Sequence, residues 1–137
     1  MIYLSYARDD RSYVEQLDRE LRELGFEVWS PEREIFPGDN WAQAIGEAVE
    51  RADAMVVVLS SAMDKSPWAE SEISYALSQQ RFKDRLFPVK LGEWSGMPWI
   101  LRRFPSYSGK AQEVARQIAL SLGAFDHPDA VARAGAR

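Results

Sequence analysis

Residues 54–59 read Ala54-Met55-Val56-Val57-Val58-Leu59, six apolar residues in a row. An extended segment of this kind presents apolar side chains on both faces, which is typical of a central parallel strand covered by helices on each side. Ser60 and Ser61 end the run. The stretch therefore predicts the middle strand of a buried parallel sheet.

Three further segments have the β-branched and aromatic composition of strands. They are residues 2–6, residues 26–29 and residues 86–91. Pro88 lies within the last of them and indicates a sheet edge or a bulge, because proline has no N–H for the strand ladder. A short fifth strand is expected around residues 105–108.

Apolar residues at helical spacing fill the intervals between the strands. The first helix is expected to start near Asp10 and to stop at Gly25, since glycine favours the conformation that ends helices. The second is expected to be capped by Asp39 and to carry an apolar stripe over residues 41–52. The last helix covers residues 111–122.

Strand and helix alternate along the chain, with connections too long for hairpins. This order favours an α/β fold in which a parallel sheet carries helices on both faces. Ligands of such sheets bind beyond the carboxyl ends of the strands. We therefore expect a functional site among the loops after Tyr6, Trp29 and Leu59.

Composition limits the classes of protein to consider. The 137 residues, 46% of them hydrophobic, support one domain, which we place at residues 1–123, followed by a linker or disordered tail at residues 124–137. The net charge of −4 argues against nucleic acid or an anionic membrane as a partner. No apolar run is long enough to span a membrane. The absence of cysteine and the single histidine argue against a metal site and favour a cytoplasmic protein.

Two nucleotide-binding motifs are missing. No G-x-G-x-x-G follows the first strand, and no G-x-x-x-x-G-K-[ST] occurs. Asp9 and Asp10 imitate the acidic pair of a response-regulator receiver, but such a domain needs an aspartate where Ser60 ends the central strand. We therefore interpret the two aspartates as helix caps and favourable first-turn charges.

A helix start signal follows the central strand, in SPWAESE at residues 66–72. Ser66 is the expected N-cap and Pro67 the first helical residue. Trp68 and Glu72 are four residues apart, so they share one side of this helix, and we expect them to flank its apolar stripe without entering the core. Spacing alone makes Glu72 an ordinary solvated glutamate and Trp68 an aromatic residue at the core edge.

Five segments, taken in order, resemble the sequence boxes of the Toll/interleukin-1 receptor (TIR) domain family, particularly those of its bacterial members. They are IYLSYA at residues 2–7, GFEVW at 25–29, FPGDNW at 36–41, VVLS at 57–60 and SPWAESE at 66–72. The resemblance covers about residues 1–123. It implies a flavodoxin-like three-layer sandwich whose parallel five-stranded sheet has the order 2-1-3-4-5.

The resemblance implies two kinds of function. Some family members are adaptors that assemble through the loop after the second strand. Others cleave NAD+ at the nicotinamide glycosidic bond, using a glutamate four residues after a tryptophan in the third helix, and this glutamate is Glu72 here. Family positions that line the nucleotide site fall on Tyr6, Arg8, Phe36 and Trp41. Phe36 departs from the aliphatic residue that is common in the family.

One carboxylate is sufficient for this reaction. Glycosidases use two because a sugar alkoxide must be protonated as it leaves, whereas nicotinamide departs from a cationic pyridinium as a neutral molecule. An ionised Glu72 stabilises the positive charge that develops on the ribose. Trp68 and Trp41 offer aromatic faces for stacking, and Arg8 offers a guanidinium for the pyrophosphate. Core packing of Trp41 and plain solvation of Arg8 remain the alternatives.

The resemblance further implies that residues 31–38 of a neighbouring TIR domain complete the site, so that the protein acts as a homo-oligomer or filament. NAD+ is then the substrate, no cofactor is expected, and the second product is either ADP-ribose or a cyclic ADP-ribose. A non-enzymatic adaptor that only self-associates is the main alternative, and a base-exchange or deoxyribosyl transferase is a third. We expect a role in bacterial anti-phage defence, with a C-terminal sensor domain beyond the tail.

Overall fold

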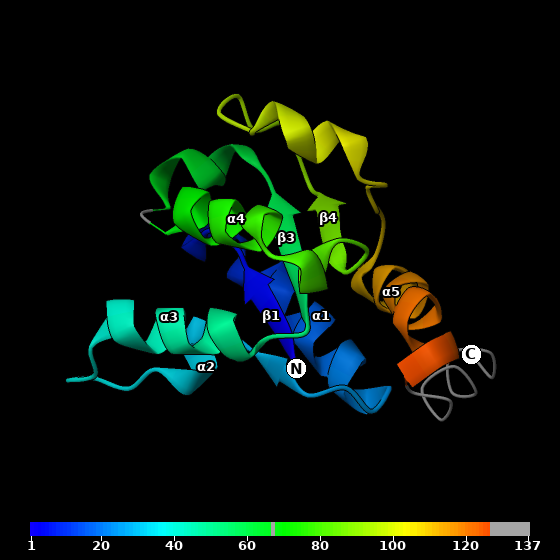
Figure 1. Cartoon of the computed structure of the whole chain (residues 1–137), viewed down its shortest axis with the longest axis horizontal. Helices are drawn as coiled ribbons and strands as arrows, with labels where there is room; N and C mark the ends of the chain where they lie inside the picture. Colours follow the sequence, from blue (N-terminus) through cyan, green and yellow to red (C-terminus); the bar gives the residue numbers. More distant parts are fainter. Residues whose placement is uncertain (67, 127–137) are drawn as a thin grey trace.

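The computed structural model describes residues 1–66 and 68–126, and it contains a four-stranded parallel sheet with helices on both faces (Figure 1). The strands are β1 (Ile2–Ser5), β2 (Val28–Trp29), β3 (Ala54–Leu59) and β4 (Leu86–Lys90), in the order β2-β1-β3-β4. The helices are α1 (Arg11–Glu23), α2 (Pro31–Glu34), α3 (Trp41–Arg51), α4 (Ala69–Ser78) and α5 (Ala111–Asp126), with 3₁₀ turns η1 (Arg8–Asp10), η2 (Ser61–Lys65), η3 (Gln80–Phe82) and η4 (Trp99–Arg103). The predicted α/β class is confirmed.

β3 is the central strand, as its sequence predicts, and it lies between β1 and β4. Val56 and Val58 pack into the core that α1 and α5 cover, whereas Met55 and Val57 pack into the core under α3 and α4. All four side chains are fully buried. Because successive side chains of a strand point to opposite faces, both sets of β3 side chains are buried, which accounts for its continuous apolar run.

The prediction of a fifth strand around residues 105–108 is wrong, because these residues form a single β-bridge and no strand. Tyr107 pairs with Val89, and its backbone N–H donates to the Pro88 carbonyl over 2.8 Å. Pro105 has no N–H to donate, which prevents a longer ladder at this end. The carbonyl of Pro88 faces this edge, so its missing N–H interrupts no hydrogen bond to β3.

Two helices start later than predicted, because the residues expected to cap them belong to the preceding turns. Asn40, and not Asp39, caps α3 and accepts a hydrogen bond from the backbone N–H of Gln43 over 3.1 Å. Asp39 is used by the preceding turn, where its carboxylate accepts from the N–H of Phe36 over 2.8 Å. At α4, the turn η2 occupies the residues before Ser66, and the helix begins only at Ala69. The expected first residue, Pro67, lies outside the described residues.

The remaining predictions concern turns and ends. Gly25 follows α1 with a φ of 99°, which confirms its role as the terminating residue. The predicted loop at residues 31–38 includes one helical turn, α2. α5 continues to Asp126, beyond the expected end, and the predicted tail after it lies outside the described residues. None of the helices in the described part of the chain has the length and apolar character needed to cross a membrane.

Candidate functional site

A pocket of about 280 Å³ opens at the carboxyl end of β1, where the sequence predicts the site. Its walls come from the loop after β1, from α2, from the start of α3, from η2 with Ser66 and Trp68, and from α4. Of the six candidate residues, five line it: Tyr6, Arg8, Trp41, Trp68 and Glu72. Phe36 is not among the lining residues, and its side chain is 65% exposed.

Glu72 is buried, with 7% of its surface exposed, so the expectation of a solvated glutamate that stays outside the core is wrong. Glu72 lies on the buried face of α4 together with Ala69, Ile73 and Ala76, and this face is directed toward β1. One carboxylate oxygen accepts a hydrogen bond from the Tyr3 hydroxyl. The other accepts from the Ser5 hydroxyl over 3.2 Å.

Burial raises the pKa of Glu72 from 4.5 to about 7, although the hydrogen bonds from Tyr3 and Ser5 act in the opposite direction. Among the described residues, no lysine or arginine forms an ion pair with Glu72. With a pKa of about 7, Glu72 is partly protonated near neutral pH, in contrast to the ionised carboxylate expected from the sequence. A carboxyl group of this kind, buried beside a cavity with an elevated pKa, is typical of functional sites.

Two tryptophans form aromatic walls of the pocket. The Trp41 side chain is 42% exposed, so it lines the pocket although it lies at the start of an apolar helix stripe. Trp68 is half-buried and also packs against the core beneath α3 and α4. Both surfaces are available to a planar ligand.

Cationic side chains also line the pocket. Arg8 is largely exposed, and its Nε lies 3.9 Å from the Glu32 carboxylate on α2. Lys65, at the end of η2, lines the same pocket and was missed in the sequence. Its position in the loop after the central strand was the available signal, since such loops meet at the carboxyl edge of the sheet. The lining thus carries these two cations together with the carboxylates of Asp9 and Glu32.

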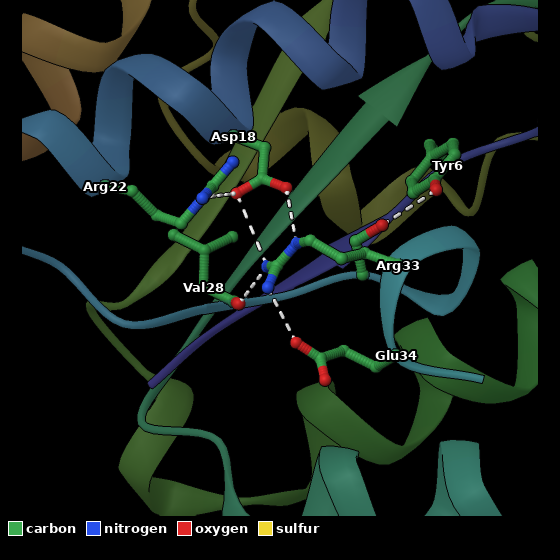
Figure 2. Close-up of polar contacts among 7 residues, drawn as sticks. Tyr6, Asp18, Arg22, Val28, Arg33 and Glu34 are labelled. Carbon is green, nitrogen blue, oxygen red and sulfur yellow. Dashed lines mark hydrogen bonds and ion pairs between the residues drawn. The ribbon is translucent and has the colours of Figure 1, made fainter. Parts of the chain in front are cut away.

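An ionic cluster holds α2, which forms one wall of the pocket, against α1 and β2 (Figure 2). Arg33 of α2 contacts the carboxylate of Asp18 on α1 over 3.2 Å and donates to the backbone carbonyl of Val28. Nearby, the hydroxyls of Tyr6 and Ser30 are 3.0 Å apart. Because these contacts join α2 to α1 and β2, they hold the pocket residues of α2 in place.

The interpretation of Asp9 and Asp10 as caps is partly wrong. Asp10 is the N-cap residue of α1 by position, but its side chain makes no capping hydrogen bond. Its carboxylate instead accepts from the Ser60 hydroxyl over 2.5 Å, which ties η1 to the end of β3. Asp9 lines the pocket. Within the part of the chain that the structure describes, no three His, Cys, Asp or Glu side chains are grouped to hold a metal.

The sequence and the fold both have known relatives. A family model described as TIR domain matches residues 2–103. The chain is 29% identical over 90 residues to the NAD(+) hydrolase PdTIR of Paracoccus denitrificans and 30% identical over 79 residues to the 2' cyclic ADP-D-ribose synthase BtTIR of Bacteroides thetaiotaomicron. These alignments cover 64% and 57% of this chain but only 30% and 28% of the two relatives, so the chain spans less than a third of their length.

A solved structure supports the fold. The TIR domain of the Toll-related receptor TRR-2 from Hydra magnipapillata superposes with a TM-score of 0.65 at 22% sequence identity. The superposition covers 78% of this chain and 82% of the receptor domain. At this identity the likeness concerns the arrangement of strands and helices alone.

Proposed function

The chain belongs to the TIR domain family, and on this premise we propose that it cleaves the bond between nicotinamide and ribose in NAD+, with Glu72 as the catalytic carboxylate. The observation that carries the proposal is the state of Glu72, a buried carboxyl group without a cationic partner among the described residues, at the edge of a pocket with aromatic walls. The names of the two bacterial relatives agree with this reaction class.

The missing cationic partner suits a cationic substrate. A positive charge near a carboxyl group favours its ionised form. When the nicotinamide ring of NAD+ enters the pocket, its pyridinium charge therefore lowers the pKa of Glu72, and the substrate itself brings about the ionisation that the reaction needs. A permanent contact with arginine or lysine would compensate the negative charge of the carboxylate before the substrate arrived.

The reaction then needs only one acidic side chain. As the bond between the ribose C1′ and the ring nitrogen breaks, its electron pair goes to the ring, and nicotinamide leaves as a neutral molecule. Positive charge develops on the ribose, and the ionised Glu72 stabilises it where it forms. A water oxygen then attacks C1′ and releases one proton to the solvent, which gives ADP-ribose. Attack by an atom of the same molecule gives a cyclic product instead.

The pocket suits part of the dinucleotide. Its volume of about 280 Å³ is slightly below the roughly 300 Å³ at the lower end of small-molecule sites. The nicotinamide riboside portion is expected inside, against Trp68 and Trp41, while Arg8 and Lys65 meet the pyrophosphate at the mouth. The rest of NAD+ then extends outside the pocket.

A second copy of the domain is proposed to cover the exposed part of the substrate. The segment after β2 lies beside the pocket, and Phe36 in this segment has a largely exposed aromatic ring. Large exposed apolar side chains are typical of interaction surfaces. The proposal therefore includes self-association through residues 31–38 and a reaction that needs no resident cofactor. It also includes a role in anti-phage defence, with a sensor domain that controls the activity.

The test is a comparison of Glu72→Gln with Glu70→Gln. Both substitutions turn a first-turn glutamate of α4 into its amide, but Glu70 is exposed and outside the pocket. Concentrated protein is incubated with NAD+, and the products are separated by liquid chromatography and mass spectrometry. Glu72→Gln is expected to lower the rate by at least about 100-fold, whereas Glu70→Gln retains it.

Size-exclusion chromatography with light scattering provides the control for assembly, which both variants should retain. An enzyme is contradicted if concentrated, associated wild-type protein releases no nicotinamide, and that result supports the adaptor alternative. Release of nicotinamide by Glu72→Gln at the wild-type rate assigns the chemistry to another residue. Turnover of free nucleosides in preference to NAD+ points to a transferase.

A further inference from the structure

We propose that Tyr3 is a positioning residue for Glu72, and that its hydroxyl together with that of Ser5 fixes both oxygens of the carboxylate. The effect of Tyr3 on catalysis rests on the proposed function of Glu72. The contacts themselves are properties of the free protein, so they can be tested without substrate. Neither Tyr3 nor Ser5 lines the pocket, and they therefore act through Glu72.

The geometry follows from strand periodicity. Tyr3 and Ser5 are two residues apart on β1, so their side chains point to the same face of the sheet, toward α4. Tyr3 donates to Oε2 of Glu72 and Ser5 donates to Oε1 over 3.2 Å. A strand thus presents two hydroxyl donors to one carboxylate, one for each oxygen. This arrangement limits both the rotation and the displacement of the group.

The ring of Tyr3 is itself fixed. Tyr3 is fully buried, and it stacks on Trp29 with ring centroids 5.1 Å apart and an interplanar angle of 13°. The two residues are register partners across β1 and β2. Because β2 leads directly into Ser30 and α2, the strand that supports Tyr3 also supports a wall of the pocket.

Other titratable groups line the two cavities that Glu72 borders. Arg8, Asp9, Glu32 and Lys65 line the pocket on one side. On the other side, Glu50 of α3 and Tyr75 of α4 line a second cavity of about 240 Å³, which Glu72 also borders. None of these residues forms a hydrogen bond or an ion pair with Glu72 in the described structure. Burial is the largest influence on Glu72, and the hydroxyls of Tyr3 and Ser5 are the polar groups in direct contact with it in the described structure.

The sign of the effect follows from the donors. A hydroxyl that donates to a carboxylate stabilises its ionised form and lowers its pKa. Loss of the Tyr3 hydroxyl should therefore raise the pKa of Glu72 above 7, and the ionised fraction at neutral pH should fall. For an enzyme that needs ionised Glu72, the acid limb of kcat/KM, which reports the free protein, should then move to higher pH.

The experiment uses Tyr3→Phe, which keeps the ring and its stacking on Trp29 and removes only the hydroxyl. Tyr13→Phe is the matched control, because the Tyr13 hydroxyl donates to the Gly109 carbonyl over 3.0 Å and lies on the opposite face. The carboxyl groups are labelled with ¹³C at the glutamate δ-carbon, and the Glu72 signal is titrated by NMR, with Glu72→Gln for its assignment. Tyr3→Phe is expected to raise the pKa by about one unit, and Tyr13→Phe to leave it unchanged.

A second variant tests the same contact by a change that should shift the pKa of Glu72 in the opposite direction. Site-specific replacement of Tyr3 by 3-fluorotyrosine keeps the ring and strengthens the donor, so it should lower the pKa of Glu72. This variant also serves if Tyr3→Phe does not fold. In rate profiles, Tyr3→Phe should recover most of the wild-type kcat/KM at high pH, whereas Glu72→Gln should recover at no pH.

The two levels of the argument can fail separately. If the chain does not cleave NAD+ but the Glu72 signal shifts as expected in both variants, the positioning contact holds and the proposed function is wrong. If folded Tyr3→Phe protein and the fluorotyrosine variant both titrate like the wild type, the inference about Tyr3 is overturned. An unchanged rate profile for an active Tyr3→Phe variant overturns it as well.

Discussion

Asp18 and Glu72 are both buried carboxylic acids, on helices that cover opposite faces of the same sheet, and their surroundings differ. Asp18 is 6% exposed and Glu72 7%. Asp18 contacts Arg22 over 2.8 Å and Arg33 over 3.2 Å, so two guanidinium groups compensate its charge (Figure 2). Glu72 contacts two neutral hydroxyls, those of Tyr3 and Ser5.

The difference separates a structural carboxylate from a candidate catalytic one. Burial of a charge is unfavourable unless a partner compensates it. Asp18 has its partners within the fold, and they join α1 to α2. Glu72 lacks such a partner among the described residues and borders a cavity, so its partner can come from outside. Burial by itself therefore does not indicate function, but burial without a countercharge at a cavity does.

The strongest test of this contrast is the pH dependence of stability. The pKa of Glu72 is about 7 in the folded protein and is expected near its ordinary value of 4.5 in the unfolded chain. The folded state thus holds this proton more tightly, and the resulting stability is fully present below pH 4.5 and is lost as the pH rises to about 7. Wild-type protein should lose about 3 kcal/mol across this range relative to Glu72→Gln.

Urea unfolding of both proteins between pH 4 and pH 8 measures this difference. Glu70→Gln is again the control, and its difference from the wild type should stay constant with pH. A constant difference for Glu72→Gln as well would mean that Glu72 titrates alike in the folded and unfolded chains. The contrast with Asp18 would then disappear.

The same chemical change at Asp18 should have the opposite sign. Asp18→Asn removes the negative charge between Arg22 and Arg33, and both guanidinium groups then lose their charged acceptor. We expect a loss of about 2 kcal/mol of unfolding free energy at pH 8, because hydrogen bonds to charged groups are strong where water is excluded. At the same pH, Glu72→Gln should be more stable than the wild type.

Thermal and urea unfolding at pH 8 measure both variants. Equal destabilisation by the two carboxylate-to-amide changes would contradict the distinction between them. A difference of opposite sign would support it without any assay of activity.

The sequence predicts the parallel sheet and its covering helices because those signals are local. An apolar run such as residues 54–59, or apolar residues at helical spacing, reports its own surroundings. The helix caps are harder to predict from local sequence. Asp39 and Asn40 can both cap α3, and Asn40 does so because Asp39 accepts a hydrogen bond from the N–H of Phe36. The fifth strand fails for a similar reason, because the pairing of Tyr107 depends on a neighbouring strand.

The pocket lies at the sheet edge where the sequence predicts a site, but the burial of Glu72 was not predicted. The spacing of Trp68 and Glu72 indicates that they share one helix face, but the burial of Glu72 depends on how α4 packs against β1. The contacts of Glu72 with Tyr3 and Ser5 join residues more than sixty positions apart. No local pattern reports such contacts. The elevated pKa of Glu72 follows from its burial, which outweighs the two hydrogen bonds.

The two arginines that compensate Asp18 should differ in importance. Arg22 lies one helical turn from Asp18, and its side chain is 47% exposed, so Arg22→Ala should lower stability by at most about 0.5 kcal/mol. Arg33 also donates to the Val28 carbonyl and joins α2 to two other elements, so Arg33→Ala should lower it by about 1 kcal/mol and speed proteolysis within residues 31–38. Urea unfolding and limited proteolysis measure the two effects. Equal behaviour of the two variants would mean that packing, and not Asp18, holds α2 beside the pocket.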